Sequence, residues 1–246
     1  YLSVRHLPPF FEHKHRVVWS NIELINEIAD IRHPAVRAIL EEMAFEDGME
    51  IIYNADLPAR SGLGSSSSFS VGLLNALHAL KGRMISKQDL AREAIRIEQE
   101  VMGEAVGSQD QIWAAFGGLN RIVFHRDGGF DVSPLILSPE NRHALQSSLM
   151  LFFTGFSRYA SEIAQKQIDN FGHKKQELQT LGQFADDATS ILQGTGELVT
   201  NLGRLMHEAW ELKRDLADGV TTPEVDDIYE AGRKAGALGG KLLGAG

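Results

Sequence analysis

A short segment rich in glycine and serine is the part of the sequence best suited to bind a ligand. Residues 57–69 contain Gly62 and Gly64, followed by serines at positions 65–68. Glycine adopts backbone torsions closed to other residues and leaves room for a ligand beside the main chain. An apolar helix is predicted to begin near residue 66, and the unpaired N–H groups and positive dipole end of a helix start attract anions. The segment therefore predicts an anion site, in which serine hydroxyls contact phosphate oxygens or a magnesium ion.

The spacing of the glycines excludes two familiar phosphate-binding loops. The lysine that follows the second glycine of a Walker A loop is missing, and the pattern is not the Gly-x-Gly-x-x-Gly of nicotinamide dehydrogenases. A turn that only caps a buried helix is the alternative interpretation. The position between a predicted strand and a buried helix, together with the run of serines, favours phosphate.

Two acidic residues further along the chain are candidates for catalytic or metal-binding roles. Asp110 stands at the start of a predicted helix over residues 109–116, and Glu98 lies on another over residues 89–102. An acidic side chain in a first helical turn is stabilised by the helix dipole, so capping alone can account for Asp110. Glu98 can belong to a solvated helix face with its acidic neighbours. The residue types alone leave these alternatives open.

Strands and helices are expected to interleave in the first part of the chain, whereas the last part is helical. Ser86 and Asp89 form a capping-box pattern, and Thr222 before Pro223 suits a helix start. This order favours an α+β class with two lobes over a doubly wound sheet. Strands are predicted over residues 1–7, 15–19, 49–55, 119–125, 129–137 and 148–154, and helices over 34–45, 66–80, 89–102, 109–116, 158–171, 175–192, 196–216 and 223–235.

The composition is that of a globular protein with one large domain or two modest ones, since 43% of its 246 residues are hydrophobic. A formal net charge of −9 disfavours nucleic-acid and anionic-membrane partners. The lack of cysteine excludes disulfides, thiolate metal sites and cysteine nucleophiles. No apolar run reaches membrane-spanning length and no signal sequence is evident, so a cytoplasmic location is expected.

Three segments, in the right order, resemble the motifs of the GHMP kinases, a family that includes galactokinase, homoserine kinase, mevalonate kinase and phosphomevalonate kinase. Residues 58–68 resemble the second motif, residues 97–111 the region of the metal-binding glutamate and catalytic aspartate, and residues 235–246 the third motif. The first motif would precede Tyr1. The resemblance implies a two-lobed fold, with a ribosomal-S5-like α/β lobe over residues 1–147 and a helix-rich lobe over residues 148–246.

The resemblance also implies roles for single residues. Asp110 would be the catalytic base that accepts the proton of the attacking hydroxyl, while Glu98 and Ser66 would hold the Mg²⁺ that accompanies ATP. Trp19 and Asn21 would lie beside the adenine. The residues implied in binding the nucleotide phosphates are Pro58, Arg60, Ser61, Gly62, Leu63, Gly64, Ser65, Ser66 and Ser67.

Four residues are expected to contact the acceptor: Gln111, Arg158, Gly244 and Ala245. Arg158 is a candidate for gripping a phosphate already present on the acceptor, because a guanidinium binds phosphate through two parallel hydrogen bonds. A surface salt bridge is the alternative for this arginine.

Within the family, residues 31–34, 62–77, 117–120 and 151–155 most resemble the bacterial D-glycero-D-manno-heptose-phosphate kinases. This implies phosphorylation of heptose 7-phosphate at the anomeric hydroxyl, on the way to nucleotide-activated heptoses of surface glycans such as lipopolysaccharide. The alternatives are an L-fucokinase- or galactokinase-like enzyme, or a non-catalytic sensor of sugar or nucleotide. The expected partners are ATP and a sugar phosphate, and a homodimer is left open.

Overall fold

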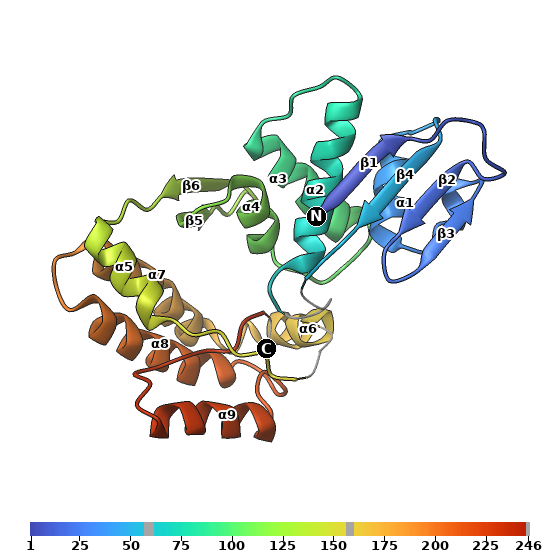
Figure 1. Cartoon of the computed structure of the whole chain (residues 1–246). Coiled ribbons are helices and arrows are strands. Elements are labelled where there is room, and N and C mark those ends of the chain that lie inside the picture. Colours follow the sequence, from blue (N-terminus) through green and yellow to red (C-terminus); the bar gives the residue numbers. More distant parts are fainter. Residues whose placement is uncertain (57–61, 156–159, 245–246) are drawn as a thin grey trace. The chain divides into compact units, whose positions relative to one another are not determined.

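The computed structural model describes residues 1–56, 62–155 and 160–244, and it divides into two compact units, Tyr1–Gly117 and Gly118–Gly246 (Figure 1). The first unit mixes strands and helices, and the second is mostly helical, so the expected α+β class is confirmed. Because the glycine–serine segment, Glu98 and Asp110 all belong to the first unit, the geometry of the candidate site can be described within it.

The first unit is built on a four-stranded sheet. Its strands lie in the order β1 (Leu2–His6), β4 (Met49–Tyr53), β2 (His15–Val18) and β3 (Ile22–Ile25). β1 pairs with β4 and β2 with β3 in antiparallel fashion, whereas β2 and β4 are parallel. A parallel pair needs a crossover connection, and the turn η1 (Ile28–Asp30) and the helix α1 (Pro34–Glu42) lie on it.

Three further helices and one π-helical turn complete the first unit: α2 (Ser65–Leu80), α3 (Lys87–Arg96), η2 (Ile97–Val101) and α4 (Gln109–Phe116). The predicted capping box is present, because Ser86 Oγ accepts from the Asp89 N–H at 3.1 Å and donates to its carboxylate at 2.7 Å. The helix that follows was expected to continue to residue 102, and its last turn is π-helical.

The core of the first unit lies between the sheet and its helices. Val17 and Ile51 from the sheet pack with Ile39 of α1 and with Leu73 and Leu77 of α2, and all five are almost inaccessible to solvent. Complete burial of one such side chain stabilises the fold by roughly 1.5–3 kcal/mol. The apolar character of α2 noted in the sequence therefore reflects its place at the centre of this unit.

The second unit contains a β-hairpin and five helices among its described residues. Its elements are β5 (Asn120–Phe124), β6 (Phe130–Pro134), α5 (Pro139–Ser148), α6 (Ala160–Asn170), α7 (Lys175–Gln193), α8 (Leu198–Arg214) and α9 (Pro223–Lys234). The helices α7 and α8 lie side by side (Figure 1). One apolar cluster centres on Trp210, Val220 and Val225, and another joins Leu137 to Leu192 and Leu198.

The boundary between the two compact units falls between Gly117 and Gly118. The lobe boundary that the family resemblance implies, between residues 147 and 148, stays a prediction. The boundary between the units reflects packing: Leu137, just after the hairpin, lies in one apolar cluster with Leu192 at the end of α7 and Leu198 at the start of α8. The hairpin and α5 therefore belong with the helices that follow them.

Two local predictions also differ from the structure. A strand was expected over residues 148–154, but Ser148 ends α5, residues 149–154 have no regular secondary structure, and Leu149 to Phe153 are exposed. A strand is stable only when a neighbour pairs with its backbone, and no described strand lies beside this segment. The strand β3 and the helix α5 were not predicted; α5 begins with Ser138 Oγ accepting from the Asn141 N–H at 3.1 Å.

Candidate active site

The glycine–serine segment leads into the first turn of the central helix α2. Gly62 and Gly64 have φ angles of 73° and 67°, in the left-handed region that favours glycine. Gly64 is the N-cap of α2, and its carbonyl accepts from the Ser68 N–H at 2.9 Å. Since Gly64 has no side chain to accept from the first-turn N–H groups, these donors can serve an anion at the positive end of the helix dipole.

A buried hydrogen-bond network connects this helix to the two other elements of the site. Ser67 Oγ donates to Glu98 Oε2 at 2.9 Å, and Gln111 Nε2 donates to the same oxygen at 2.5 Å. The three residues are buried, with exposures of 6% for Ser67, 1% for Glu98 and 0% for Gln111. The start of α2, the π-helical turn η2 and the first turn of α4 therefore meet at one carboxylate.

Asp110 lies directly beside Gly64 of the glycine–serine segment. A Cβ atom placed on Gly64 would be 3.1 Å from Asp110 Cγ and 3.2 Å from Asp110 Oδ2. The residue as a whole is exposed, but neighbouring atoms partly remove its carboxyl from water, and this desolvation raises the pKa of Asp110. A carboxylate with a raised pKa beside an anion site is a suitable proton acceptor for a bound hydroxyl.

The π-helical turn presents Glu98 to this network. Its wider turn is closed by the Met102 N–H, which donates to the Ile97 carbonyl at 2.9 Å. Single π turns inside helices occur often at functional sites. Here the turn carries a charged residue that is almost fully buried, which is costly unless the charge is compensated. The two hydrogen bonds compensate one of its oxygens.

Glu104 is a second acidic side chain of this region. Burial, followed by the negative charge of Glu98, raises the pKa of Glu104. The sequence allowed Glu98 to lie on a solvated helix face, and the six-residue separation from Glu104 gave no signal that the two carboxyls influence each other. The loop that follows η2 turns back, since the Glu104 N–H donates to the Glu98 carbonyl at 2.9 Å.

The oxygen atoms around Glu98 fit a hard divalent cation. Glu98 Oε1 is buried and has no hydrogen-bond partner among the described residues, so it is free to coordinate. Mg²⁺ takes oxygen ligands, retains several waters and is commonly held by one or two carboxylates with substrate phosphates. Sequence reasoning paired Glu98 with Ser66; in the structure Ser66 is exposed, and it is Ser67 that bonds to Glu98. No group of three or more metal-ligating His, Asp or Glu side chains occurs in the described part of the chain.

Gln111 has a different environment from the one expected. It was assigned to the acceptor, but its side chain is buried and its amide nitrogen binds Glu98. The helical period explains this, because adjacent residues of α4 point about 100° apart. Asp110 therefore lies at the surface beside Gly64, while Gln111 points into the unit.

Trp19 connects to the site through a row of aromatic rings. Its ring lies 5.1 Å from that of His33, which lies 4.7 Å from Phe69 in the first turns of α2. The Trp19 Nε1–H donates to Glu23 at 2.8 Å, and the Asn21 carbonyl accepts from the Trp19 N–H at 2.9 Å. Trp19 is half-buried and Asn21 is exposed.

Several predicted site residues cannot be placed beside this site. Pro58, Arg60, Ser61, Arg158 and Ala245 lie outside the described residues. Gly244 belongs to the second unit, where its carbonyl accepts from Lys213 Nζ at 2.6 Å.

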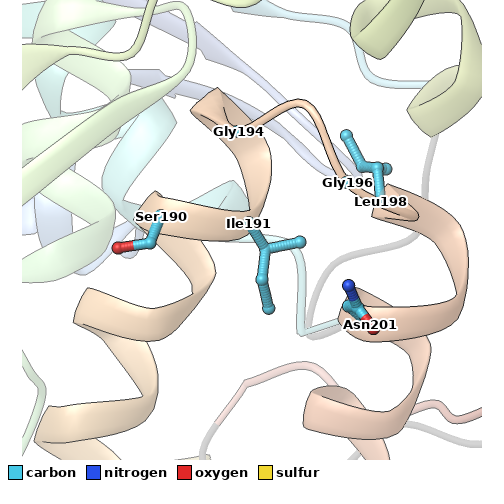
Figure 2. A pocket seen from close by; sticks show the side chains of 6 residues that line it. All are labelled: Ser190, Ile191, Gly194, Gly196, Leu198 and Asn201. Atoms are coloured by element: carbon cyan, nitrogen blue, oxygen red, sulfur yellow. The ribbon is translucent and has the colours of Figure 1, made fainter.

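The hollows described in the structure contain none of the residues assigned from the sequence. One of about 250 Å³ lies at the turn between α7 and α8, and Figure 2 shows its lining of Ser190, Ile191, Gly194, Gly196, Leu198 and Asn201. Another of about 610 Å³ lies at the end of the sheet opposite Trp19, with His6, His13, Lys14 and Asp47 in its lining. Among the described helices, none has both the length and the apolar character needed to span a membrane.

Comparisons with known proteins identify the family. A family model named GHMP kinases N terminal domain matches residues 28–118, and a second, GHMP kinases C terminal, matches residues 197–246. The chain belongs to the GHMP kinase family. Both models match in the order of the motifs, so the resemblance inferred from the sequence is confirmed.

Individual relatives include kinases of two kinds of acceptor. The chain is 29% identical over 193 residues to a D-glycero-alpha-D-manno-heptose 7-phosphate kinase of Campylobacter jejuni. The aligned region covers 78% of this chain and 57% of that kinase. This chain is 27% identical over 221 residues to a mevalonate kinase of Pyrococcus horikoshii, covering 86% of this chain and 61% of the relative. The chain therefore spans about three fifths of the length of these curated relatives.

The fold matches that of solved kinases over the full chain. A crystal structure of a D-glycero-D-manno-heptose 1-phosphate kinase from Bacteroides thetaiotaomicron superposes with a TM-score of 0.75 at 22% identity, covering 100% of this chain and 73% of the other. The likeness establishes the α+β fold of the GHMP kinases for this chain.

Proposed function

We propose that the protein is an ATP-dependent sugar kinase whose acceptor is a heptose phosphate, D-glycero-D-manno-heptose 7-phosphate, phosphorylated at its anomeric hydroxyl. The observation that carries the kinase assignment is the contact between the Asp110 carboxyl and Gly64, at the start of the helix whose N–H groups suit an anion. This contact supports the proposal that Asp110 accepts a proton close to the terminal phosphate of a bound nucleotide. The 29% identity to a heptose 7-phosphate kinase supports the choice of acceptor.

Each part of the reaction has a candidate residue. The N–H groups at the start of α2 and the hydroxyls of Ser65 and Ser66 bind the phosphates of ATP, and Glu98 contributes a carboxylate oxygen to the cation site. When bound, Mg²⁺ neutralises charge on the β- and γ-phosphates. Asp110 accepts the hydroxyl proton as the sugar oxygen bonds to the γ-phosphorus; the bond to the β,γ-bridging oxygen breaks and ADP leaves.

A coupled assay of ADP release tests the proposal. The full-length protein is incubated with ATP, Mg²⁺ and each of heptose 7-phosphate, unphosphorylated heptose, L-fucose, galactose and mevalonate. Turnover with heptose 7-phosphate at least tenfold above that with the unphosphorylated sugar is expected. Preference for L-fucose or galactose would transfer the assignment to those sugars, and preference for mevalonate would remove the protein from the sugar kinases.

A non-catalytic sensor with a kinase fold is the alternative of another class. Nucleotide binding without turnover on any acceptor would favour it and would end the enzymatic proposal. The Asp110→Asn variant distinguishes the two, because a sensor does not need a proton acceptor. If nucleotide binding and cellular function both survive that substitution, the carboxylate has no catalytic role.

A further inference from the structure

A single buried carboxylate oxygen receives hydrogen bonds from two different helices. Glu98 Oε2 accepts from Ser67 Oγ in the first turn of α2 and from Gln111 Nε2 in the first turn of α4. The donors are 44 residues apart in the sequence and share no other described polar contact, so their convergence on one atom is a product of the fold. Hydrogen bonds to a charged group are stronger than those between neutral groups, and this buried carboxylate depends on them.

The two oxygens of Glu98 differ in what binds them. Oε2 has both hydrogen bonds, whereas Oε1 is buried and lacks a partner among the described residues. A buried carboxylate oxygen with no donor is costly by itself, so the arrangement is consistent with a ligand that completes it. The two donors fix the rotation of the carboxylate and thereby decide which oxygen is left for that ligand.

We propose that Gln111 and Ser67 are positioning residues that orient Glu98 for a divalent cation, with Oε1 as the coordinating atom. The inference rests on the proposed function, in which the cation accompanies a nucleotide, but it concerns residues that act through Glu98. Gln111 has a second consequence. Because it follows Asp110 in α4, its bond to Glu98 ties the helix of the proposed base to the carboxylate of the cation site.

An amide is suited to this position for an electrostatic reason. Gln111 donates through Nε2 without adding charge beside the Glu98 carboxylate. A glutamate at position 111 would place a second negative charge beside Glu98, or would require a proton between the two, and it would weaken both roles. Methionine has a similar volume and no donor, so Gln111→Met removes the hydrogen bond with little change in packing.

The experiment measures how nucleotide binding depends on Mg²⁺, without requiring turnover. Displacement of a fluorescent nucleotide by ADP is recorded over a series of Mg²⁺ concentrations for the parent, Gln111→Met and Ser67→Ala. Loss of a residue that supports a metal ligand typically weakens metal affinity 10–100-fold. We therefore expect the half-saturating Mg²⁺ concentration to rise at least tenfold in Gln111→Met, with a smaller rise in Ser67→Ala.

Gln99 provides the matched control. Gln99 lies in η2, the same turn as Glu98. Its side chain donates to the Val106 carbonyl at 2.8 Å and to Ser108 Oγ at 3.2 Å, but not to Glu98. Gln99→Met removes an amide of the same size from the same region. If the effect of Gln111→Met arises from the orientation of Glu98, the half-saturating Mg²⁺ concentration of Gln99→Met should stay within about twofold of the parent value, even where Gln99→Met changes stability.

The outcomes separate the two proposals. A folded Gln111→Met variant with the parent's Mg²⁺ dependence overturns the positioning role, even if the parent is an active kinase. If Gln111→Met does not fold, the result rests on Ser67→Ala, and an unchanged Mg²⁺ dependence there has the same meaning. A parent that turns over no acceptor but shows the expected shifts loses the proposed reaction and keeps the positioning role. A parent that binds no nucleotide loses both.

Discussion

The carboxyl of Asp110 occupies the space that a side chain would fill at Gly64. A Cβ on Gly64 would lie 3.1 Å from Asp110 Cγ and 3.3 Å from Asp110 Cβ, and the φ of 67° at Gly64 is itself unfavourable for other residues. The glycine therefore has two functions: it permits the turn into α2, and it leaves room for the proposed base beside the glycine–serine segment.

Gly64→Ala should strongly impair activity, because the added methyl group would displace the Asp110 carboxyl and strain the turn. Left-handed backbone costs a non-glycine residue roughly 1–2 kcal/mol. Turnover and thermal melting should be measured together with Gly72→Ala, the control within α2, where a new Cβ meets only Leu2 Cδ2 at 3.7 Å. Gly72→Ala should be neutral or slightly stabilising. Equal activity of the two variants would contradict a special role for the space beside Gly64.

Asp110→Asn should lower kcat by about 10²–10⁴-fold, the usual contribution of a positioned general base. The same variant should be more stable than the parent at neutral pH, because partial burial disfavours the ionised carboxylate. Steady-state kinetics and thermal melting of one preparation check both effects. Lost activity together with lost stability would indicate a structural role for this aspartate.

The pH profile of kcat/KM should report the raised pKa of Asp110. Desolvation lifts this pKa above its ordinary value of 3.8, so the protonated, inactive form persists to higher pH than for a solvated aspartate. Activity should therefore fall, as the pH is lowered, at a point above that value, and Asp110→Asn should lack this limb. A profile that stays flat down to pH 3.8 would exclude Asp110 as the base.

Gly239 in the third motif packs directly against the backbone of α8. A Cβ there would be 1.9 Å from the Gly203 carbonyl oxygen and 2.7 Å from the His207 nitrogen, both main-chain atoms that cannot move aside cheaply. Gly239→Ala should destabilise the protein by about 1–3 kcal/mol or more. The adjacent Gly240→Ala is the control, because its Cβ would meet only Tyr229 Cε2 at 3.7 Å. Thermal melting should separate the two variants; similar melting temperatures would refute the packing argument.

Lys213 should make the stability of the second unit depend on pH. Burial and then the charge of Lys241 lower the pKa of Lys213 from 10.5 to about 8. Between these values the unfolded chain binds more protons than the folded one, so the free energy of unfolding rises with pH; below about 8 both states are protonated and the cost of the buried charge is fully present. Lys213→Met should therefore melt at a higher temperature than the parent at pH 7, and its melting temperature should rise less than that of the parent between pH 8 and pH 10.5. A lower melting temperature at pH 7 would show that its bond to Gly244 outweighs the buried charge.

The turns and helix starts could be predicted because they are local. Gly62 and Gly64 mark a turn that needs positive φ, and both have it. Ser86 with Asp89 and Thr222 with Pro223 mark helix starts, and the side chains of Ser86 and Thr222 cap α3 and α9. These features depend on backbone torsions and on neighbours within one turn, so a sequence specifies them without knowledge of the fold.

The remaining features depend on contacts between distant segments. Whether Ser66 or Ser67 faces Glu98 depends on how α2 packs, and one residue along a helix turns a side chain by about 100°. The same rotation separates buried Gln111 from exposed Asp110. Residues 149–154 have the composition of a strand but no described strand to pair with. The sequence by itself determined the order of the motifs, the turns and the family to which the chain belongs; the tertiary structure decided which hydroxyl and which amide meet the buried carboxylate, because only packing between helices selects the side of a helix that faces the interior.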